Sequence, residues 1–162
     1  MTDTPPTPET QAFRLKAVQA QLTNLLNDPA VRARLRQSAG EGDWSAMETL
    51  GHTVEMIPYW MHHCGTIIRA GEPPNFGRTL ESPERLEAVA RAALADPDEM
   101  ARLLADAVRD AARRIRAMTV GERGKTGNHN RRGPMTVADV IQILIVEHAE
   151  DHLAQVRAAV GR

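Results

Sequence analysis

The chain has 162 residues, a formal net charge of −1, one cysteine and an aromatic content of 3%. This length fits a single domain with one hydrophobic core, and the abundance of Ala, Leu, Glu and Arg favours helix. The near-neutral charge gives no reason to expect nucleic acid or an anionic membrane as a partner, and one cysteine excludes an internal disulfide. No run approaches the roughly 18 apolar residues of a membrane span, and the polar start MTDTPPTPET does not resemble a signal peptide. We therefore expect a cytoplasmic protein.

The chain begins with a Pro-rich segment that we interpret as a flexible arm. We place this arm at residues 1–8 and expect one domain over residues 9–162. Thr7 followed by Pro8 is typical of a helix start, because a capping hydroxyl precedes a proline at the first helical position. An apolar stripe continues to Asp28, where an Asp-Pro pair interrupts this first helix.

The second long helix begins at a capping box, Ser45-x-x-Glu48, and ends near Gly71. Its apolar residues recur at alternating spacings of three and four, which is typical of bundle packing. The connection that follows, GEPPNFGRTLESPE, is too long for a simple antiparallel turn. We therefore expect the third long helix, which starts at Asp96, to run in the same direction as the second. A short helix starting at Ser82 lies between them.

A Gly-rich basic segment, residues 121–134, is interpreted as a loop before the fourth long helix. That helix opens at Thr136-x-x-Asp139 and runs to about Val160. No alternating strand pattern is visible anywhere in the sequence. The sequence thus predicts an all-α fold: a four-helix bundle with a long crossover connection between helices two and three, plus short extra helices.

Two histidines near the end of the chain, His148 and His152, have the spacing of a metal-ligand pair. Residues four apart lie on one face of a helix, so two imidazoles can converge on one ion. With six histidines in the chain, some pair has this spacing by chance roughly one time in five. The pair also lies on the apolar stripe of its helix, where two neighbouring imidazoles would repel each other if both were protonated. A metal site and a pair of hydrogen-bonded core histidines are equally good interpretations of these two residues alone.

A third histidine, His52, favours the metal site. It lies on a second apolar stripe of helix two, seven residues after the Ser45 cap, while His152 lies eight residues before Val160. If helices two and four are antiparallel neighbours, His52 and His152 are at nearly the same depth, because each residue rises about 1.5 Å. Three imidazoles would leave coordination positions open, which is the pattern of a catalytic site.

The chain resembles the DinB/YfiT-like superfamily of metalloenzymes. The resemblance rests on WS-x-x-E-x-x-x-H at Trp44–His52, on the VEMIPYW that follows, on H-x-x-x-H-x-x-Q-V at His148–Val156, and on the connection FGRTLESPERL. It implies a four-helix bundle with a long crossover, often a homodimer, and a divalent metal on His52, His148 and His152. Similar proteins include thiol-cofactor-dependent transferases and isomerases.

Three carboxylates close to these histidines in sequence have two interpretations. Glu48, Glu55 or Asp151 could orient a ligand's second ring nitrogen or act as a base. A helix cap or a solvated charge is the more ordinary role, so we assign no catalytic acid or base.

His63 shares the stripe of His52, but it is three turns away, about 16 Å along the axis. We expect it to serve in packing or at the surface.

The basic segment could bind an anionic ligand or nucleic acid through Arg131 and Arg132, but no aromatic residue interleaves with its charges. We favour a mobile solvated connection. Because helix four runs away from the basic segment toward His152, we expect this segment at the opposite end of the bundle from the histidines.

Cys64 is expected to be a buried apolar residue. The second apolar stripe of helix two, with Met56, Trp60, His63 and Ile67, could contribute to a dimer interface.

The leading functional interpretation is a metal-dependent enzyme that activates water or a thiol, either a hydrolase or a thiol-dependent transferase. Zinc or nickel suits three imidazoles best, and iron or copper also fits. The expected partners are a second copy of the chain and a small-molecule substrate, with a low-molecular-weight thiol as a candidate, and neither nucleic acid nor a membrane. The alternative is a non-catalytic dimeric binding or stress-response module with a structural metal or none, and a DNA-binding role comes third.

Overall fold

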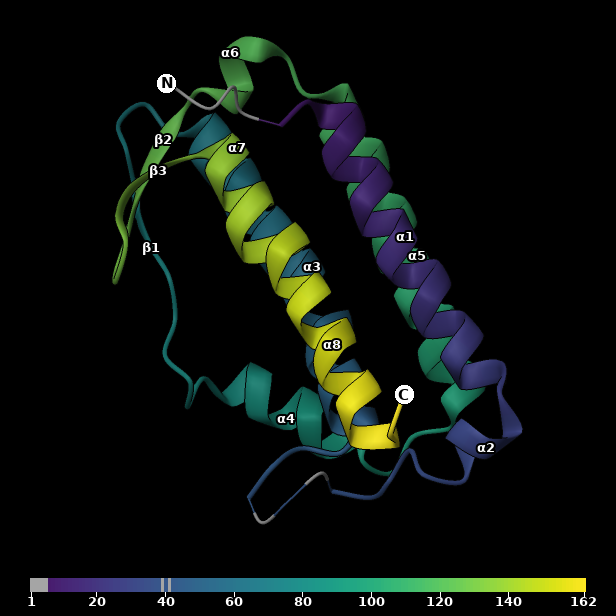
Figure 1. The fold of residues 1–162 in the computed structure, drawn as a ribbon. Coiled ribbons are helices and arrows are strands. Elements are labelled where there is room, and N and C mark those ends of the chain that lie inside the picture. Colours follow the sequence, from purple (N-terminus) through teal and green to yellow (C-terminus); the bar gives the residue numbers. More distant parts are fainter. Residues whose placement is uncertain (1–5, 39, 41) are drawn as a thin grey trace.

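The computed structural model describes residues 6–38, 40 and 42–162, and its main feature is a bundle of four long helices with a small sheet beside one end (Figure 1). The long helices are α1 (Pro8–Asn27), α3 (Ala46–Arg69), α5 (Pro97–Ala117) and a final run made of α7 (Val137–Asp139), the π-helix η1 (Val140–Glu147) and α8 (His148–Val160). The short elements are α2 (Pro29–Arg32), β1 (Asn75–Phe76), α4 (Pro83–Ala92), α6 (Val120–Arg123), β2 (Thr126–His129) and β3 (Gly133–Thr136). The predicted four-helix bundle is confirmed.

The long helices begin where local capping chemistry predicted. The Thr7 hydroxyl accepts a hydrogen bond from the Thr10 backbone N–H, and Pro8 is the first residue of α1. Complete capping boxes start α3 at Ser45 and α7 at Thr136. The predicted arm, residues 1–8, lies mostly outside the described residues, which begin at residue 6.

The crossover sets the directions of the helices. In Figure 1, α1 and the final run point one way along the bundle, whereas α3 and α5 point the other way. The segment between α3 and α5, which contains β1 and α4, returns the chain to the end where α3 began. α3 packs against α4, α5 and α8, and α1 packs against α5 and α8. The predicted parallel pair and the antiparallel α3–α8 pair are thus both present.

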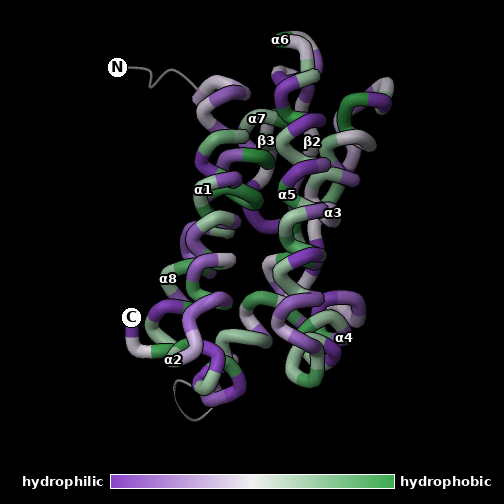
Figure 2. The backbone as a smooth tube through the Cα atoms, turned by 90° about the vertical axis from the view of Figure 1, so that its right-hand side faces the viewer, coloured by the Kyte–Doolittle hydropathy of each residue, from purple (hydrophilic) through white to green (hydrophobic). Residues whose placement is uncertain are grey.

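The core fills the space between the four long helices. Apolar and polar residues alternate along each of them, as the hydropathy colours in Figure 2 show. Fully buried side chains from all four include Leu15, Leu50, Leu104 and Ile141. α4 also lies unusually close to α3, because a Cβ on Gly51 would be 2.2 Å from that of Ala92. A glycine is required there, one residue before His52.

The small sheet was not predicted from the sequence. The supposed loop forms the antiparallel hairpin β2–β3, and β1 from the crossover pairs in parallel with β2. These strands are two to four residues long, and β2 and β3 contain glycine and proline, so no alternating apolar pattern marks them. Their stability comes from packing on α3, where Trp60 contacts Phe76 and His129.

The second apolar stripe of α3 is therefore covered within its own chain. Trp60 is 6% exposed and Ile67 is 2% exposed, so this stripe does not offer the dimer interface suggested for it. Homodimerisation remains a prediction. None of the helices in the described ranges is long and apolar enough to cross a membrane.

Candidate metal centre

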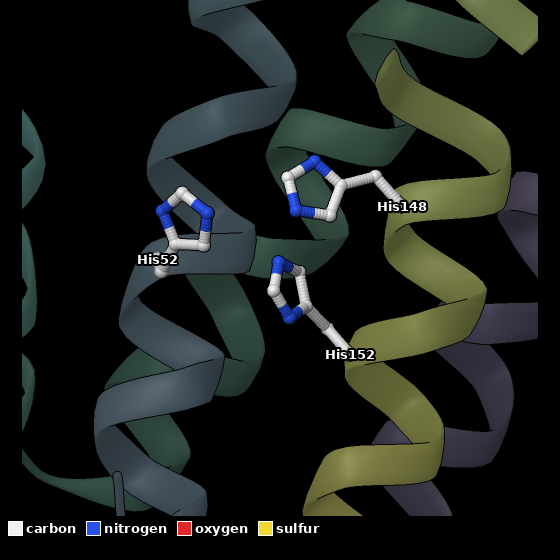
Figure 3. Close-up of side chains that lie close together, drawn as sticks. All are labelled: His52, His148 and His152. Atoms are coloured by element: carbon white, nitrogen blue, oxygen red, sulfur yellow. The ribbon is translucent and has the colours of Figure 1, made fainter. Parts of the chain in front are cut away.

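Three histidines from two helices meet on one side of the bundle. His52 comes from α3, and His148 and His152 come from successive turns of α8 (Figure 3). One ring nitrogen of each lies within 4.8 Å of the others. The ring centroids of His52 and His152 are 4.8 Å apart, and those of His148 and His152 are 4.3 Å apart. The structure thus brings together the three residues that the sequence singled out.

Burial leaves two of these imidazoles with an unpaired nitrogen. His52 is 3% exposed and His152 is 4% exposed, and His52 Nδ1 and His152 Nε2 have no hydrogen-bond partner among the described residues. His152 Nδ1 lies 2.8 Å from the Gln155 side-chain oxygen, which can only accept, so this nitrogen carries the proton. Nε2 of His152 then presents its lone pair to the cluster.

The cluster is neutral at physiological pH. Burial lowers the pKa of His52, and it lowers the pKa of His148 to about 4, with a further contribution from the neighbouring charge of His52. Burial and the proximity of His148 lower the pKa of His152 to about 3. Neutral imidazoles are the form that binds a metal ion.

A pocket of about 810 Å³ opens beside the three histidines. Its other walls come from the segment before α3, from the crossover, and from the turn between β2 and β3; they include Trp44, Arg78, Arg85, Arg131 and Arg132. The size is typical of small-molecule sites. The cluster therefore borders space that a substrate can enter.

The expectation that the basic segment lies far from the histidines is wrong. The β2–β3 hairpin folds back beside the bundle because β2 pairs with β1 of the crossover (Figure 1). His129, Arg131 and Arg132 consequently line the same pocket as His52. Sequence reasoning considered only the direction of the fourth helix and could not see this pairing.

Comparison with known proteins identifies the relatives of this fold. The family model described as the DinB superfamily matches residues 14–156. The chain belongs to the DinB superfamily. A search of curated proteins finds no match.

The solved structures that share the fold of this DinB-superfamily chain include those of two proteins. One is YfiT from Bacillus subtilis, described as a probable metal-dependent hydrolase with an unusual four-helix bundle topology. It is 16% identical, with a TM-score of 0.77, and the match covers 96% of this chain and 86% of YfiT. The other is a mycothiol-dependent maleylpyruvate isomerase, 14% identical with a TM-score of 0.69. That match covers 93% of this chain but only 61% of the isomerase. At these identities the likeness shows the fold.

Glu55 in this DinB-superfamily chain is not the solvated charge that we expected. Its carboxylate accepts hydrogen bonds from both terminal nitrogens of Arg78, one of them at 2.8 Å, and lies 3.5 Å from His52 Nδ1, beyond an ordinary hydrogen bond. Burial alone would raise the pKa of Glu55, but the contacts with Arg78 and His52 outweigh it and hold this pKa at about 2. Glu55 thus stays ionised next to the ring of His52. Glu48 is the predicted helix cap, and Asp151 is exposed.

Two other residues behave as predicted. His63 packs against Tyr59 and Phe76 and takes no part in the histidine cluster. Cys64 is fully buried, and burial raises the pKa of its thiol to about 12, so it packs as a small apolar residue and is not a nucleophile.

Sequence reasoning missed several residues of this site. Gln155 carried a usable signal, because it lies three residues after His152 and shares its helix face. Arg78 comes from a part of the long crossover without regular structure, where no periodicity reports its direction, and Arg85 comes from the short helix α4, whose position the sequence does not fix. Arg85 stacks on Trp44, with its guanidinium carbon 4.7 Å from the ring centroid, and the Trp44 ring lies edge-on to His52.

Proposed function

We propose that this DinB-superfamily protein is a metal-dependent enzyme acting on a small molecule, with His52, His148 and His152 holding a divalent transition metal. One observation carries the proposal: three neutral imidazoles converge beside an open pocket, and the buried His152 Nε2 has no partner in the described part of the chain. An unsatisfied buried polar atom costs about 1–3 kcal/mol, and coordination would remove that cost.

The donor set fits such an ion. All three candidate ligands are imidazoles, which suit zinc, nickel, iron or copper, and we favour zinc or nickel. When bound, the ion would lower the pKa of a coordinated water or thiol, or polarise a substrate carbonyl.

The chain's own groups contribute orientation. The side-chain oxygen of Gln155 fixes the tautomer of His152 and thereby directs Nε2 toward the cluster. The Glu55 carboxylate, itself fixed by Arg78, faces Nδ1 of His52 and favours a proton on that nitrogen. Nε2 of His52 then remains available as a ligand.

Two reaction types agree with the comparisons: hydrolysis, and transfer or isomerisation that uses a low-molecular-weight thiol. YfiT is described as a probable metal-dependent hydrolase, and the isomerase is described as mycothiol-dependent. The pocket favours an enzyme over the alternative, a non-catalytic module, because a structural metal site would be closed to ligands.

Metal analysis of the purified protein tests the proposal. We expect about one equivalent of a transition metal in the wild type and in His62→Ala, which removes an exposed histidine outside the cluster. The triple variant His52→Ala/His148→Ala/His152→Ala should retain none. Equal metal in all three proteins would refute the assignment. Assays of ester hydrolysis and of thiol conjugation on the metal-loaded protein then separate the two reaction types.

A further inference from the structure

The turn between β2 and β3, residues 130–132, is held in a fixed position over the pocket. His129 Nδ1 accepts hydrogen bonds from the backbone N–H groups of Arg131 and Arg132, each at 3.2 Å. The Asn130 N–H donates to the Phe76 carbonyl of the crossover at 2.9 Å. Gly77 has a φ of +129°, and a Cβ there would lie 2.3 Å from the Asn130 side-chain oxygen. Three hydrogen bonds from its backbone N–H groups therefore fix the conformation of the turn.

This turn adds positive charge to the pocket, and the described residues supply it with no ion-pair partner. Arg131 and Arg132 both line the pocket, and no carboxylate in residues 6–38, 40 and 42–162 is within ion-pair distance of either. By contrast, Arg78 is neutralised by Glu55. Among the lining residues in the described part of the chain, Asp43 is the one acid.

The ring of Trp60 lies beneath the same turn. Trp60 lines the pocket, packs on His129 with ring centroids 5.8 Å apart, and is 6% exposed. Its indole Nε1–H has no acceptor among the described residues. The nitrogen itself is shielded from the pocket, so a ligand there would pack beside the Trp60 ring without accepting from its N–H.

We propose that this end of the pocket binds the oxyanion group, a carboxylate or a phosphate, of the small-molecule substrate, through Arg131 and Arg132 beside the Trp60 ring. An oxyanion accepts hydrogen bonds from the two guanidinium groups, which bind such anions in a planar fork, and balances their charge. That the anion belongs to a substrate of the metal centre rests on the proposed function; the anion site itself does not. Trp60 follows His52 by eight residues on α3, so the anionic end lies on the order of 12 Å from the histidines along the axis.

An NMR titration of the tryptophan indole N–H signals tests this site directly. Full-length ¹⁵N-labelled protein, in zinc-loaded and in chelator-treated and dialysed forms, is titrated with acetate, with inorganic phosphate and with neutral acetamide at constant ionic strength. Trp44→Phe identifies the Trp60 signal. We expect a saturable shift of that signal with acetate or phosphate in both forms and none with acetamide, and the anion that saturates at lower concentration identifies the class.

Charge-matched variants complete the test. Arg131→Gln/Arg132→Gln should weaken anion binding by about tenfold or more, because charge-assisted hydrogen bonds are lost. Arg109→Gln/Arg113→Gln removes two exposed arginines from α5 and should leave binding unchanged; the backbone signals report folding. A linear response, an equal response to acetamide, or no loss in Arg131→Gln/Arg132→Gln overturns the inference. Because the metal-free form is included, that failure is distinct from a failure to retain metal.

Discussion

Two buried polar clusters in this protein differ in how completely they are satisfied. On the α1 side, the fully buried Gln11 accepts a hydrogen bond from Arg123 at 2.9 Å and donates to the Ala138 carbonyl at 3.2 Å. On the α3–α8 side, Nε2 of His152 has no partner in the described part of the chain. Burial of polar groups is common to both clusters and therefore does not mark function. The clusters differ because the histidine cluster contains a buried nitrogen without a partner among the described residues. A polar network that only stabilises the fold pairs its buried groups.

The largest expected difference between the two clusters is in their response to acid. The pKa values of His148 and His152 in the folded chain lie well below the ordinary value of 6.5, so the unfolded chain binds more protons as the pH falls. The stability of the metal-free protein is therefore full above pH 6.5 and is lost progressively toward pH 3–4. Between pH 7 and 5 we expect a loss of about 1–2 kcal/mol for each of these two histidines, measured by urea unfolding. Arg123 does not titrate in this range.

The triple-alanine variant of the cluster is the control. It keeps His63 and His129, whose pKa values are also lowered by burial, so the difference from wild type isolates the cluster. The lowered pKa of Glu55 stabilises the fold above its ordinary pKa of 4.5, and this stability is lost only at lower pH, outside this window. Equal slopes for the two proteins between pH 7 and 5 would contradict the prediction.

Next in size is the effect of breaking the satisfied cluster. Gln11→Ala removes the acceptor for Arg123 and leaves its buried guanidinium short of a partner. We expect the free energy of unfolding to fall by about 1–3 kcal/mol, with metal content unchanged. Gln37→Ala, at an exposed position, should cost less than about 0.5 kcal/mol. A loss of metal in Gln11→Ala would show that the two clusters are coupled.

An effect on metal affinity, with no comparable loss of stability, is expected from Gln155→Ala. This change removes the acceptor that fixes the tautomer of His152 but leaves all three imidazoles in place. Metal affinity should fall by about 10–100-fold, as for other residues that orient metal ligands, and competition with a fluorescent chelator measures it. Gln19→Ala on α1 is the matched control. Unchanged affinity in Gln155→Ala would mean that packing alone orients His152.

Local chemistry predicted most of the fold and part of the site. The caps at Thr7, Ser45 and Thr136 act within one turn of helix, so the sequence reports them directly. Helical periodicity and depth also predicted that His52 would meet the pair on α8.

The rest of the pocket depended on contacts that no local pattern records. The basic turn reaches the pocket beside the histidines because Phe76 pairs with His129, more than fifty residues later in the chain. Arg78 reaches Glu55 because the crossover returns along α3. Such placements follow from tertiary packing and not from the propensity of either segment.

The crossover has a consequence for how the histidine cluster forms during folding. His52 and His148 are separated by roughly 100 residues, so their approach closes a very long loop. The α3–α8 contact that joins them is among the most non-local in the chain, and such contacts are expected to form late. Acquisition of metal would therefore report the completion of folding, and a stopped-flow metal signal should lag behind the appearance of helix.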